Sequence, residues 1–291
     1  MLNMRQKGFQ RRTFLWAGLL MGLAGWWAGA AWAADETASS TPWEKFNVSL
    51  GGFYSNTQSS VRVGGGLGVD LDLEKALDIK RDSTVFRAES GWRFSDNRRH
   101  RVDLSWFALH RTATRTIGQD FDITRPNGST TTISAGSDVT SHFNLDILSA
   151  DYGYSFLQDD RVDLELLAGL YVMPIHFDLS TRGAVVTEGK LAFTAPLPVL
   201  GYRMDFALTP KWFFRSQSQF FYVKYQSFTG KLVEMRGAVE YLPIKHVGVG
   251  LGVDTFNAAL EAQGKDYPNV DLSGRVQLAY TGLQFYAKYF F

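Results

Sequence analysis

The chain has 291 residues, carries a formal net charge of +1 and contains no cysteine. The near-neutral charge excludes a broad electrostatic attraction to nucleic acid. The lack of cysteine excludes disulfides, thiolate metal sites and cysteine nucleophiles. Aromatic residues make up 14% of the chain, yet the mean hydropathy is only −0.13. That combination excludes a helical membrane protein and favours strands with one apolar and one polar face.

The first 33 residues have the pattern of a signal peptide. A basic segment that ends at Arg12 precedes an uncharged apolar run over 14–32. Ala31-Trp32-Ala33 then supplies the small-x-small pattern that signal peptidase recognises. We expect cleavage before Ala34, with an uncleaved membrane anchor as the alternative. A short periplasmic segment over 34–44 then precedes one domain over 45–291.

Beyond Ala34, no run approaches the ~18 consecutive apolar residues of a membrane-spanning helix. The recurring pattern is instead an alternation of apolar and polar residues, which is typical of strands. It is clearest over 246–256, where Val247, Val249, Leu251 and Val253 share one face. The segments are about ten residues or longer, the length that transmembrane strands require.

The connections between these segments fall into two alternating kinds. Short polar turns are predicted at 96–99, 158–160, 209–210 and 243–245. Longer loops are predicted near 65–82, 118–139, 180–191 and 259–273, with Pro126-Asn127-Gly128 as a hairpin tip. Tight turns at one end and long loops at the other are typical of outer-membrane barrels.

These turns divide the chain into ten strands, and an even number suits a closed antiparallel transmembrane β-barrel. Eight or twelve strands are the alternatives, because the first segment can divide at 55–57 and 120–136 can form an extra hairpin outside the membrane. The all-β prediction places the strands at 45–64, 82–95, 100–117, 138–157, 161–179, 192–208, 211–226, 229–243, 246–258 and 274–291.

Aromatic residues gather beside the predicted tight turns. Trp92 and Phe94 precede one turn and Trp106 follows it, while Trp212 and Tyr241 lie next to two others. Aromatic side chains near strand ends form the interfacial girdles of membrane barrels. This placement favours a membrane barrel over a soluble sandwich.

The leader that ends at Ala33, the alternating strands and the terminal Phe291 together resemble the bacterial outer-membrane β-barrel proteins as a class. The resemblance is architectural and points to no subfamily. It implies a location in the cell outer membrane, surrounded by outer-membrane lipids. It also implies that Phe291 is the assembly signal by which the barrel-assembly machinery recognises the chain.

With the apolar face assigned to lipid, the opposite face is rich in charge of both signs. Two interpretations compete: a lumen plugged by ion pairs, or a porin-like, hydrated and conducting lumen. We favour a plugged or very narrow lumen, with the space above Gly248, Gly250 and Gly252 filled by facing side chains. The predicted lumen-lining residues are Arg87, Glu89, Arg93, Arg101, Asp103, Asp163, Glu165, Arg203, Asp205, Arg215, Glu234, Arg236, Glu240, Asp254 and Lys288, with Asp146, Asp151, Gln217 and Gln219 on the same face.

Three histidines near the predicted loops are the candidates for catalysis. They are His110, His142 with Asn144 and Asp146, and His176 with Asp178. Strand parity points His110 and His176 outward, and no motif fixes a serine nucleophile beside any of them. We therefore expect that the chain is not an enzyme, and a rim enzyme acting on lipid or peptide is the alternative.

Neither a metal nor a cofactor is expected. Asp70, Asp72 and Glu74 offer oxygen ligands but lack the spacing of a calcium loop. A solvated acidic loop or a short luminal helix over 73–77 is the preferred interpretation. The glycines of 64–68 precede no helix or Lys-Ser/Thr pair, so they do not form a phosphate-binding loop.

The leading functional hypothesis is a non-enzymatic outer-membrane barrel, either structural or a narrow pore for small solutes. The alternatives are the rim enzyme and a surface receptor or adhesin that uses the longer loops. The sequence offers no feature for binding nucleic acid, and it does not identify a solute.

Overall fold

The computed structural model describes residues 42–63, 71–72, 74, 80–116, 118, 120–124, 130–182, 189–267 and 270–291. The chain divides into two compact units, Met1–Ser40 and Thr41–Phe291, and every described residue belongs to the second. The predicted signal peptide and its cleavage site lie outside the described residues. So do the glycine-rich segment 64–68, Asp70 and the predicted hairpin tip at 126–128.

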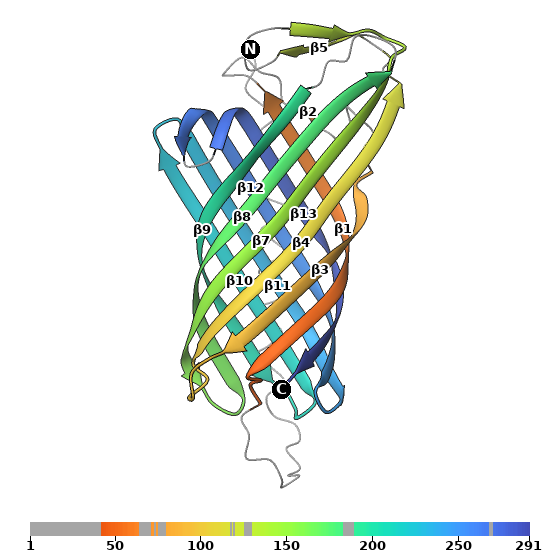
Figure 1. Cartoon of the computed structure of the whole chain (residues 1–291). Helices are drawn as coiled ribbons and strands as arrows, with labels where there is room; N and C mark the ends of the chain where they lie inside the picture. The colour runs from red at the N-terminus through yellow and green to blue at the C-terminus, as the bar shows by residue number, and fades with distance from the viewer. Residues whose placement is uncertain are drawn as a thin grey trace, which may run out of the picture. The chain divides into compact units, whose positions relative to one another are not determined.

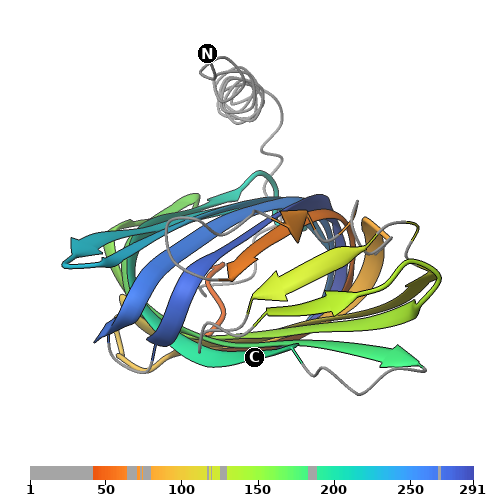
Figure 2. The same ribbon diagram turned by 90° about the horizontal axis from the view of Figure 1, so that it is seen from above.

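The second unit is a closed antiparallel β-barrel of ten strands, and the predicted fold class is confirmed. Figure 1 shows the tilted strands from the side, and Figure 2 shows the ring from above. Each strand pairs with its neighbour in the barrel order. The strands are β1 (Phe46–Val63), β3 (Asp82–Arg93), β4 (His100–Thr116), β7 (Asp138–Gln158), β8 (Val162–Arg182), β9 (Gly189–Ala207), β10 (Trp212–Tyr225), β11 (Phe228–Ile244), β12 (Val247–Tyr267) and β13 (Val270–Phe290).

The first and last strands close the ring. β1 pairs with β13 in one continuous register, from Asn47 opposite Phe290 to Val63 opposite Gly274. The carbonyl oxygen of Phe291 also accepts hydrogen bonds from the backbone nitrogens of Lys45 and Phe46. Closure leaves no open sheet edge, and an open edge in hydrocarbon would leave backbone groups unpaired.

Three short strands lie outside the ring. β2 (Leu71–Asp72) pairs with β1 at Ser60 and Val61. β5 (Phe121–Thr124) and β6 (Thr130–Ile133) form a separate hairpin. This hairpin lies within 120–136, where the sequence allowed an extra hairpin apart from the barrel.

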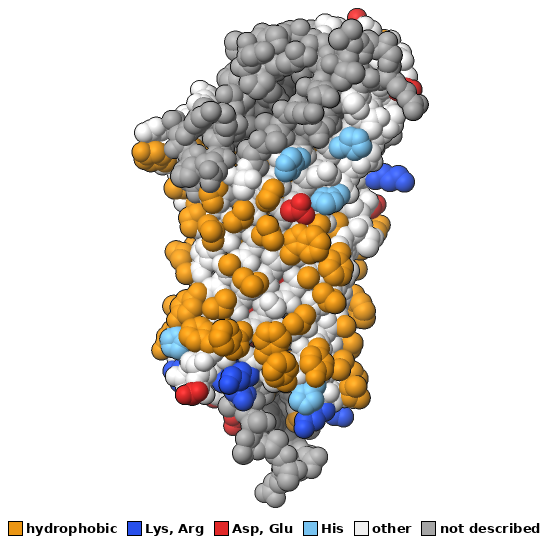
Figure 3. Space-filling model, in the orientation of Figure 1, with side chains coloured by type: hydrophobic (Ala, Val, Ile, Leu, Met, Phe, Trp, Pro, Cys, Tyr) orange, Lys and Arg blue, Asp and Glu red, His pale blue; other side chains and the backbone are white. Residues whose placement is uncertain are grey.

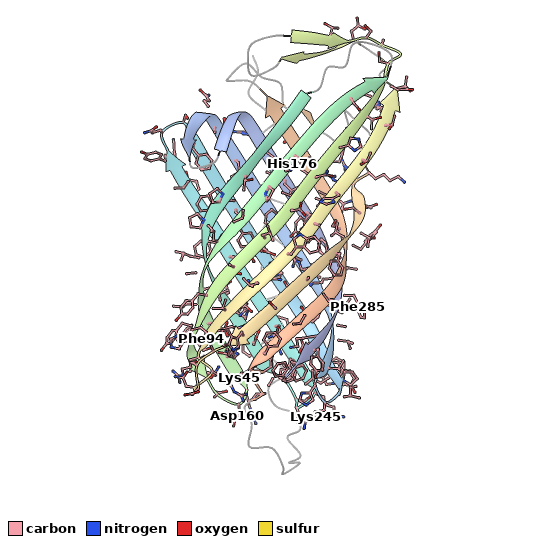
Figure 4. The ribbon with its side chains drawn as sticks, viewed as in Figure 1. Lys45, Phe94, Asp160, His176, Lys245 and Phe285 are labelled. Atoms are coloured by element: carbon pink, nitrogen blue, oxygen red, sulfur yellow. The ribbon has the colours of Figure 1, made fainter. Side chains whose placement is uncertain are left out.

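The two ends of the barrel differ in their connections. At the turn end lie the four tight connections and the carboxyl terminus, marked in Figure 4 by Phe94, Asp160 and Lys245. Local side chains fix these turns: the Asp159 carboxylate accepts from the backbone nitrogens of Arg161 and Val162 at 2.7 and 2.8 Å. The opposite end, here called the loop end, carries the connections between β1 and β3 and between β4 and β7 (Figure 1).

One predicted loop is wrong. The region 259–273 was expected to be a long connection, but β12 continues to Tyr267 and β13 begins at Val270. The reason is that alternation persists there: Leu260 and Val276 are buried on the inner side. Glu261 and Arg275 form an ion pair across the two strands, and such cross-strand pairs stabilise a sheet.

Figure 3 shows a belt of apolar side chains on one face of the barrel, nearer the turn end, and each barrel strand carries exposed large apolar residues. Leu251 and Phe285 are each 60% exposed, and Leu166 and Leu200 are equally prominent. A continuous apolar band of this kind is incompatible with water and fits the hydrocarbon of a membrane. The barrel is therefore a transmembrane barrel.

Above this belt the polarity of both surfaces inverts. On β12 the outward residue changes from Val253 to Thr255, and the inward residue changes from Asp254 to Phe256. On β13 the outward residue changes from Leu283 to Thr281. We call this height the inversion level. On these two strands the polarity below this level is that of a membrane protein, with apolar residues outside, and above it that of a protein in water.

The inversion level predicts how a charge is tolerated along one strand. Replacing lipid-facing Phe285 by Arg should destabilise the barrel by about 2–4 kcal/mol, because the charge enters hydrocarbon. The same substitution at outward-facing Thr281 should cost about 0–1 kcal/mol. Urea unfolding in lipid vesicles measures both values. Equal costs at the two positions would contradict the assigned membrane boundary.

Candidate functional site: the barrel interior

The lower part of the interior, from the turn end to the inversion level, is filled with charged side chains. With the exception of Asp146, the charged residues predicted to line the lumen project inward, and most are buried. They come from nine of the ten barrel strands, all except β1, and most of them form three groups of ion pairs together with Glu44, which precedes β1. Such pairing is expected, because an isolated charge in a narrow interior is costly.

The first group closes the turn end. Arg215 of β10 contacts Glu240 at 3.0 Å and Asp205 at 3.0 Å. Lys288 of β13 contacts the same Glu240 at 2.5 Å. Glu44, which precedes β1, reaches back to Arg215 at 3.2 Å and to Lys288 at 2.8 Å. This group therefore links the segment before the first strand, β1, to the last strand, β13.

Trp43 lies beside this group and is fully buried. Its ring packs on Phe213, Ala207 and Leu242, with a centroid separation of 6.4 Å to Phe213. Its indole nitrogen donates a hydrogen bond to the carbonyl oxygen of Asp159 at 2.7 Å. Sequence reasoning assigned this residue to a plain periplasmic segment. It missed the role of Trp43 at the turn-end opening of the barrel, here called the mouth.

The second group lies in the wall formed by β3, β4, β8 and β9. Arg93 contacts Asp163 at 2.7 Å and Glu165 at 2.8 Å. Arg203 contacts Glu165 at 2.7 Å and Asp103 at 2.9 Å, and Arg101 contacts Asp103 at 2.7 Å. Glu165 and Asp103 therefore each pair with two arginines that come from different strands.

The third group lies just below the inversion level. Arg87 contacts Asp254 at 2.7 Å and Glu234 at 3.4 Å. Arg236 contacts Glu89 and, more distantly, Glu234 at 3.6 Å. Asp254 is fully buried, so its charge depends on Arg87.

A polar cavity of about 120 Å³ lies among the first two groups and Arg236. That volume holds several water molecules. Among the described residues, Asp205 Oδ1 and Arg215 Nε have no hydrogen-bond partner, and both residues line the cavity. Water in the cavity would satisfy such atoms. We refer to this space as the polar chamber.

Four packed aromatic rings lie next to the charged half: Phe107 and Phe256 stack on Tyr280, and Phe53 meets Tyr280 edge-on. Tyr280 lies 5.1 Å from Phe256, 5.3 Å from Phe107 and 5.2 Å from Phe53 between ring centroids. The Arg87 guanidinium lies 5.1 Å from the centroid of Phe107, a cation–π distance. Phe53, Phe107, Phe256 and Tyr280 are called the aromatic layer below.

The interior above the aromatic layer is a dry apolar core. Its cavity measures only about 10 Å³, too small for more than a single water molecule. The cavity lining is entirely apolar. The buried side chains there include Leu109, Phe143, Leu145, Met173, Ile175 and Leu197.

Sequence reasoning missed this apolar core because it assigned every apolar face to lipid. One signal was available: β7 and β8 carry apolar residues on both faces near their centres. On β7, for example, Leu148 is 44% exposed while its neighbour Ile147 is buried. Apolar residues on both faces indicate burial on both sides.

Near the loop end, Glu74 enters the interior. Its carboxylate accepts from the Ser59 backbone nitrogen at 2.8 Å and pairs with Arg111 at 2.7 Å. All three residues are buried. Both carboxylate oxygens are therefore used within the protein, and Glu74 is helical, as the luminal-helix interpretation of 73–77 proposed. The rest of that segment lies outside the described residues.

The space above Gly250 is filled by the facing Tyr286 side chain. A Cβ atom on Gly250 would lie 2.2 Å from the Tyr286 ring. The Tyr286 hydroxyl donates to Glu240 at 3.0 Å. Gly250 thus allows Tyr286 to lie flat against β12 and reach the first group of ion pairs.

The rim histidines are spread over the outer surface. His110, His142 and His176 are all exposed, and Figure 3 shows histidine side chains above the apolar belt. His110 lies 3.4 Å from Asp146, and His142 Nδ1 lies 3.0 Å from the Thr112 hydroxyl. Asp146 was assigned to the lumen, and that assignment is wrong because odd-numbered residues of β7 face inward.

Among the described residues, no group of three or more His, Asp or Glu side chains is placed to hold a metal ion. No described helix is long and apolar enough to span a membrane.

No protein-family profile matches the chain, and no curated sequence matches it. Among solved structures, the chain is similar to the outer membrane protease OmpT from Escherichia coli, with a TM-score of 0.44, 12% identity and coverage of 89% of this chain and 100% of that one. It is also similar to Ail, the attachment invasion locus protein of Yersinia pestis (TM-score 0.34, 12% identity, coverage 83% and 99%). A third is the Pseudomonas putida toluene transporter TodX (TM-score 0.37, 10% identity, coverage 86% and 92%).

The closed ring, the apolar belt and the polar interior define the class. The chain has the architecture of the bacterial outer-membrane β-barrel proteins, without features of one subfamily.

Removal of Arg87 should be far more costly than removal of an exposed arginine. Arg87→Ala leaves Asp254 buried without its partner, and we expect a loss of about 3–5 kcal/mol of stability. Arg275→Ala breaks the partly exposed pair with Glu261 and should cost at most about 1 kcal/mol. Urea unfolding in lipid vesicles measures the loss of stability of each variant. Adding Asp254→Asn should recover part of the Arg87→Ala loss, and no recovery would contradict the pairing.

Glu44 predicts a specific dependence of stability on pH. Burial alone would raise the pKa of its carboxyl, but the positive charges of Arg215 and Lys288 outweigh burial and hold that pKa well below its usual range. A lowered pKa stabilises the fold above the usual glutamate value of about 4.3, and this stabilisation is lost as pH falls through the lowered value. The difference in Tm between the natural chain and Glu44→Gln should thus be constant above about pH 5 and shrink in stronger acid. A Tm difference that grows on acidification would contradict the lowered pKa of Glu44.

Proposed function

We propose that this chain is a structural barrel of the bacterial outer membrane, closed to the passage of solutes. In this proposal the turn end faces the periplasm and the apolar belt contacts outer-membrane lipids. The observation that carries the proposal is the aromatic layer with the dry apolar core above it. A pore for small solutes requires a continuous hydrated path, whereas the cavity among the described core residues above Arg87 measures about 10 Å³ and is lined by apolar side chains.

Two features of the charged half support the same proposal. Its arginines are each held by carboxylates at ion-pair distance, so none of them is free to attract a passing anion. The aromatic layer also lies directly on the Arg87 guanidinium. Moving these rings aside would separate a cation from its aromatic partners in a low-dielectric interior, which is unfavourable.

The proposal treats the chain as a non-enzyme, and this stays a prediction. His142 hydrogen-bonds a threonine hydroxyl and His110 lies beside Asp146. Neither contact supplies the serine or water position that hydrolysis of lipid or peptide requires. Phe291 remains the proposed assembly signal for the barrel-assembly machinery, and it is 61% exposed at the turn end.

Planar-bilayer recording tests the closed state. We expect the purified natural chain to produce no reproducible openings after insertion. A sample that migrates more slowly on a gel when boiled than when unboiled would establish that the inserted material is a folded barrel. Reproducible single-channel openings from that folded protein would overturn the proposal in favour of a narrow pore.

A positive control comes from the aromatic layer. Phe107→Gly combined with Phe256→Gly and Tyr280→Gly removes three of its rings and should leave a cavity open to water. A small conductance in this variant, absent from the natural chain, would show that the layer is the barrier. The matched control is Phe285→Gly, which removes an aromatic ring of the same kind from the lipid face.

A further inference from the structure

The two ends of the polar chamber are closed in different ways. Toward the loop end, the barrier is the aromatic layer, whose rings project from barrel strands. Toward the turn end, the barrier includes Trp43 and Glu44, which precede β1 and belong to no strand. The chamber lies directly behind them, since Glu44 is part of its lining.

Trp43 and Glu44 are held by a small set of contacts at the mouth. Glu44 binds Arg215 and Lys288, and Trp43 binds the Asp159 carbonyl and the face of Phe213. A third contact is made by Arg98, which donates to the carbonyl oxygen of Trp43 at 2.6 Å. None of these contacts is part of the strand pairing that closes the ring.

The ion pairs around Glu44 remain satisfied without it. Arg215 keeps Asp205 at 3.0 Å and Glu240 at 3.0 Å, and Lys288 keeps Glu240 at 2.5 Å. Two cations would then face two carboxylates. Removing one partner of a buried ion pair is costly when it leaves the other charge unpaired. Removal of Glu44 leaves neither Arg215 nor Lys288 unpaired, so this cost is avoided.

We propose that Trp43 and Glu44 form a displaceable plug, and that its release opens the polar chamber to the periplasm while the aromatic layer stays shut. The inference rests on the closed barrel proposed above. The barrel is then a chamber with one opening, accessible to small polar molecules from the periplasmic side.

A single cysteine in the chamber tests the plug, because the chain has no cysteine of its own. Ser49 faces inward, is 7% exposed and lines the chamber, and Ser49→Cys changes only one atom. The probe is a small, charged methanethiosulfonate reagent applied to the purified full-length protein in detergent. The rate of modification reports how often the chamber is open to water.

Glu44→Ala combined with Ser49→Cys should react at least about tenfold faster than Ser49→Cys alone, the change that corresponds to about 1.4 kcal/mol of closing free energy. Trp43→Ala should act in the same direction. The matched control is Glu74→Ala, which removes a buried carboxylate and its arginine pair at the other end. It should leave the rate unchanged.

Equal rates with and without Glu44, or equal acceleration by Glu74→Ala, would overturn the plug. Heat-modifiable migration checks that each variant is folded, and Glu44→Gln replaces Glu44→Ala if the latter is not. The plug variants should also remain silent in planar bilayers, because the aromatic layer is intact. Conductance in the natural chain would refute the closed barrel, whereas unchanged labelling refutes the plug alone.

Discussion

In hydrocarbon, every backbone N–H and C=O group must be paired within the protein, and the rest of this structure depends on that constraint. The chain meets it by pairing β1 with β13 in one continuous register, from Asn47 opposite Phe290 to Val63 opposite Gly274. Once the ring is closed, each strand has one face toward lipid and one toward a narrow interior. Apolar residues are then needed outside, and the polar residues that keep the chain exportable are confined to the interior, where each charge needs a partner. The ion pairs of the lower half are thus a consequence of closure.

The same constraint ends where the membrane ends, and the polarity of the wall changes there. Above the inversion level the outer face meets water, so Thr255 and Asn257 are tolerated outside and Phe256 and Leu260 are buried inside. The charged lower half of the interior and the apolar core therefore meet at the inversion level. Arg87 lies at that junction, bound to Asp254 on one side and covered by Phe53 and Phe107 on the other. A side chain with a planar, weakly hydrated cation suits both neighbours.

The closed barrel with ten strands could be predicted from the sequence, because alternation and turn residues are local signals. Most strand limits agree within a few residues. The failures share one cause: the sequence was interpreted with a single rule, apolar outward, for the entire strand length. That rule ends β12 at 258, although the strand continues to Tyr267 with its apolar residues turned inward. It also hides the apolar core, since it assigns Phe143 and Met173 to lipid, and only the apolar residues on both faces of β7 and β8 indicate otherwise. The contacts of Trp43 and Glu44 with Asp159 and Arg215 join residues more than one hundred positions apart, and no local pattern predicts them.

The two barriers also differ in what their opening would require. The aromatic layer is built from side chains of β1, β4, β12 and β13, on both sides of the closing pair of strands. Opening it means separating packed rings that rigid, hydrogen-bonded strands hold in place. The mouth at the turn end is covered by residues that precede the first strand, and their departure leaves strand pairing and the remaining ion pairs intact. A barrel built this way can change at its periplasmic end without weakening its barrier to the outside, because the closure of the ring and the closure of the mouth rest on different contacts.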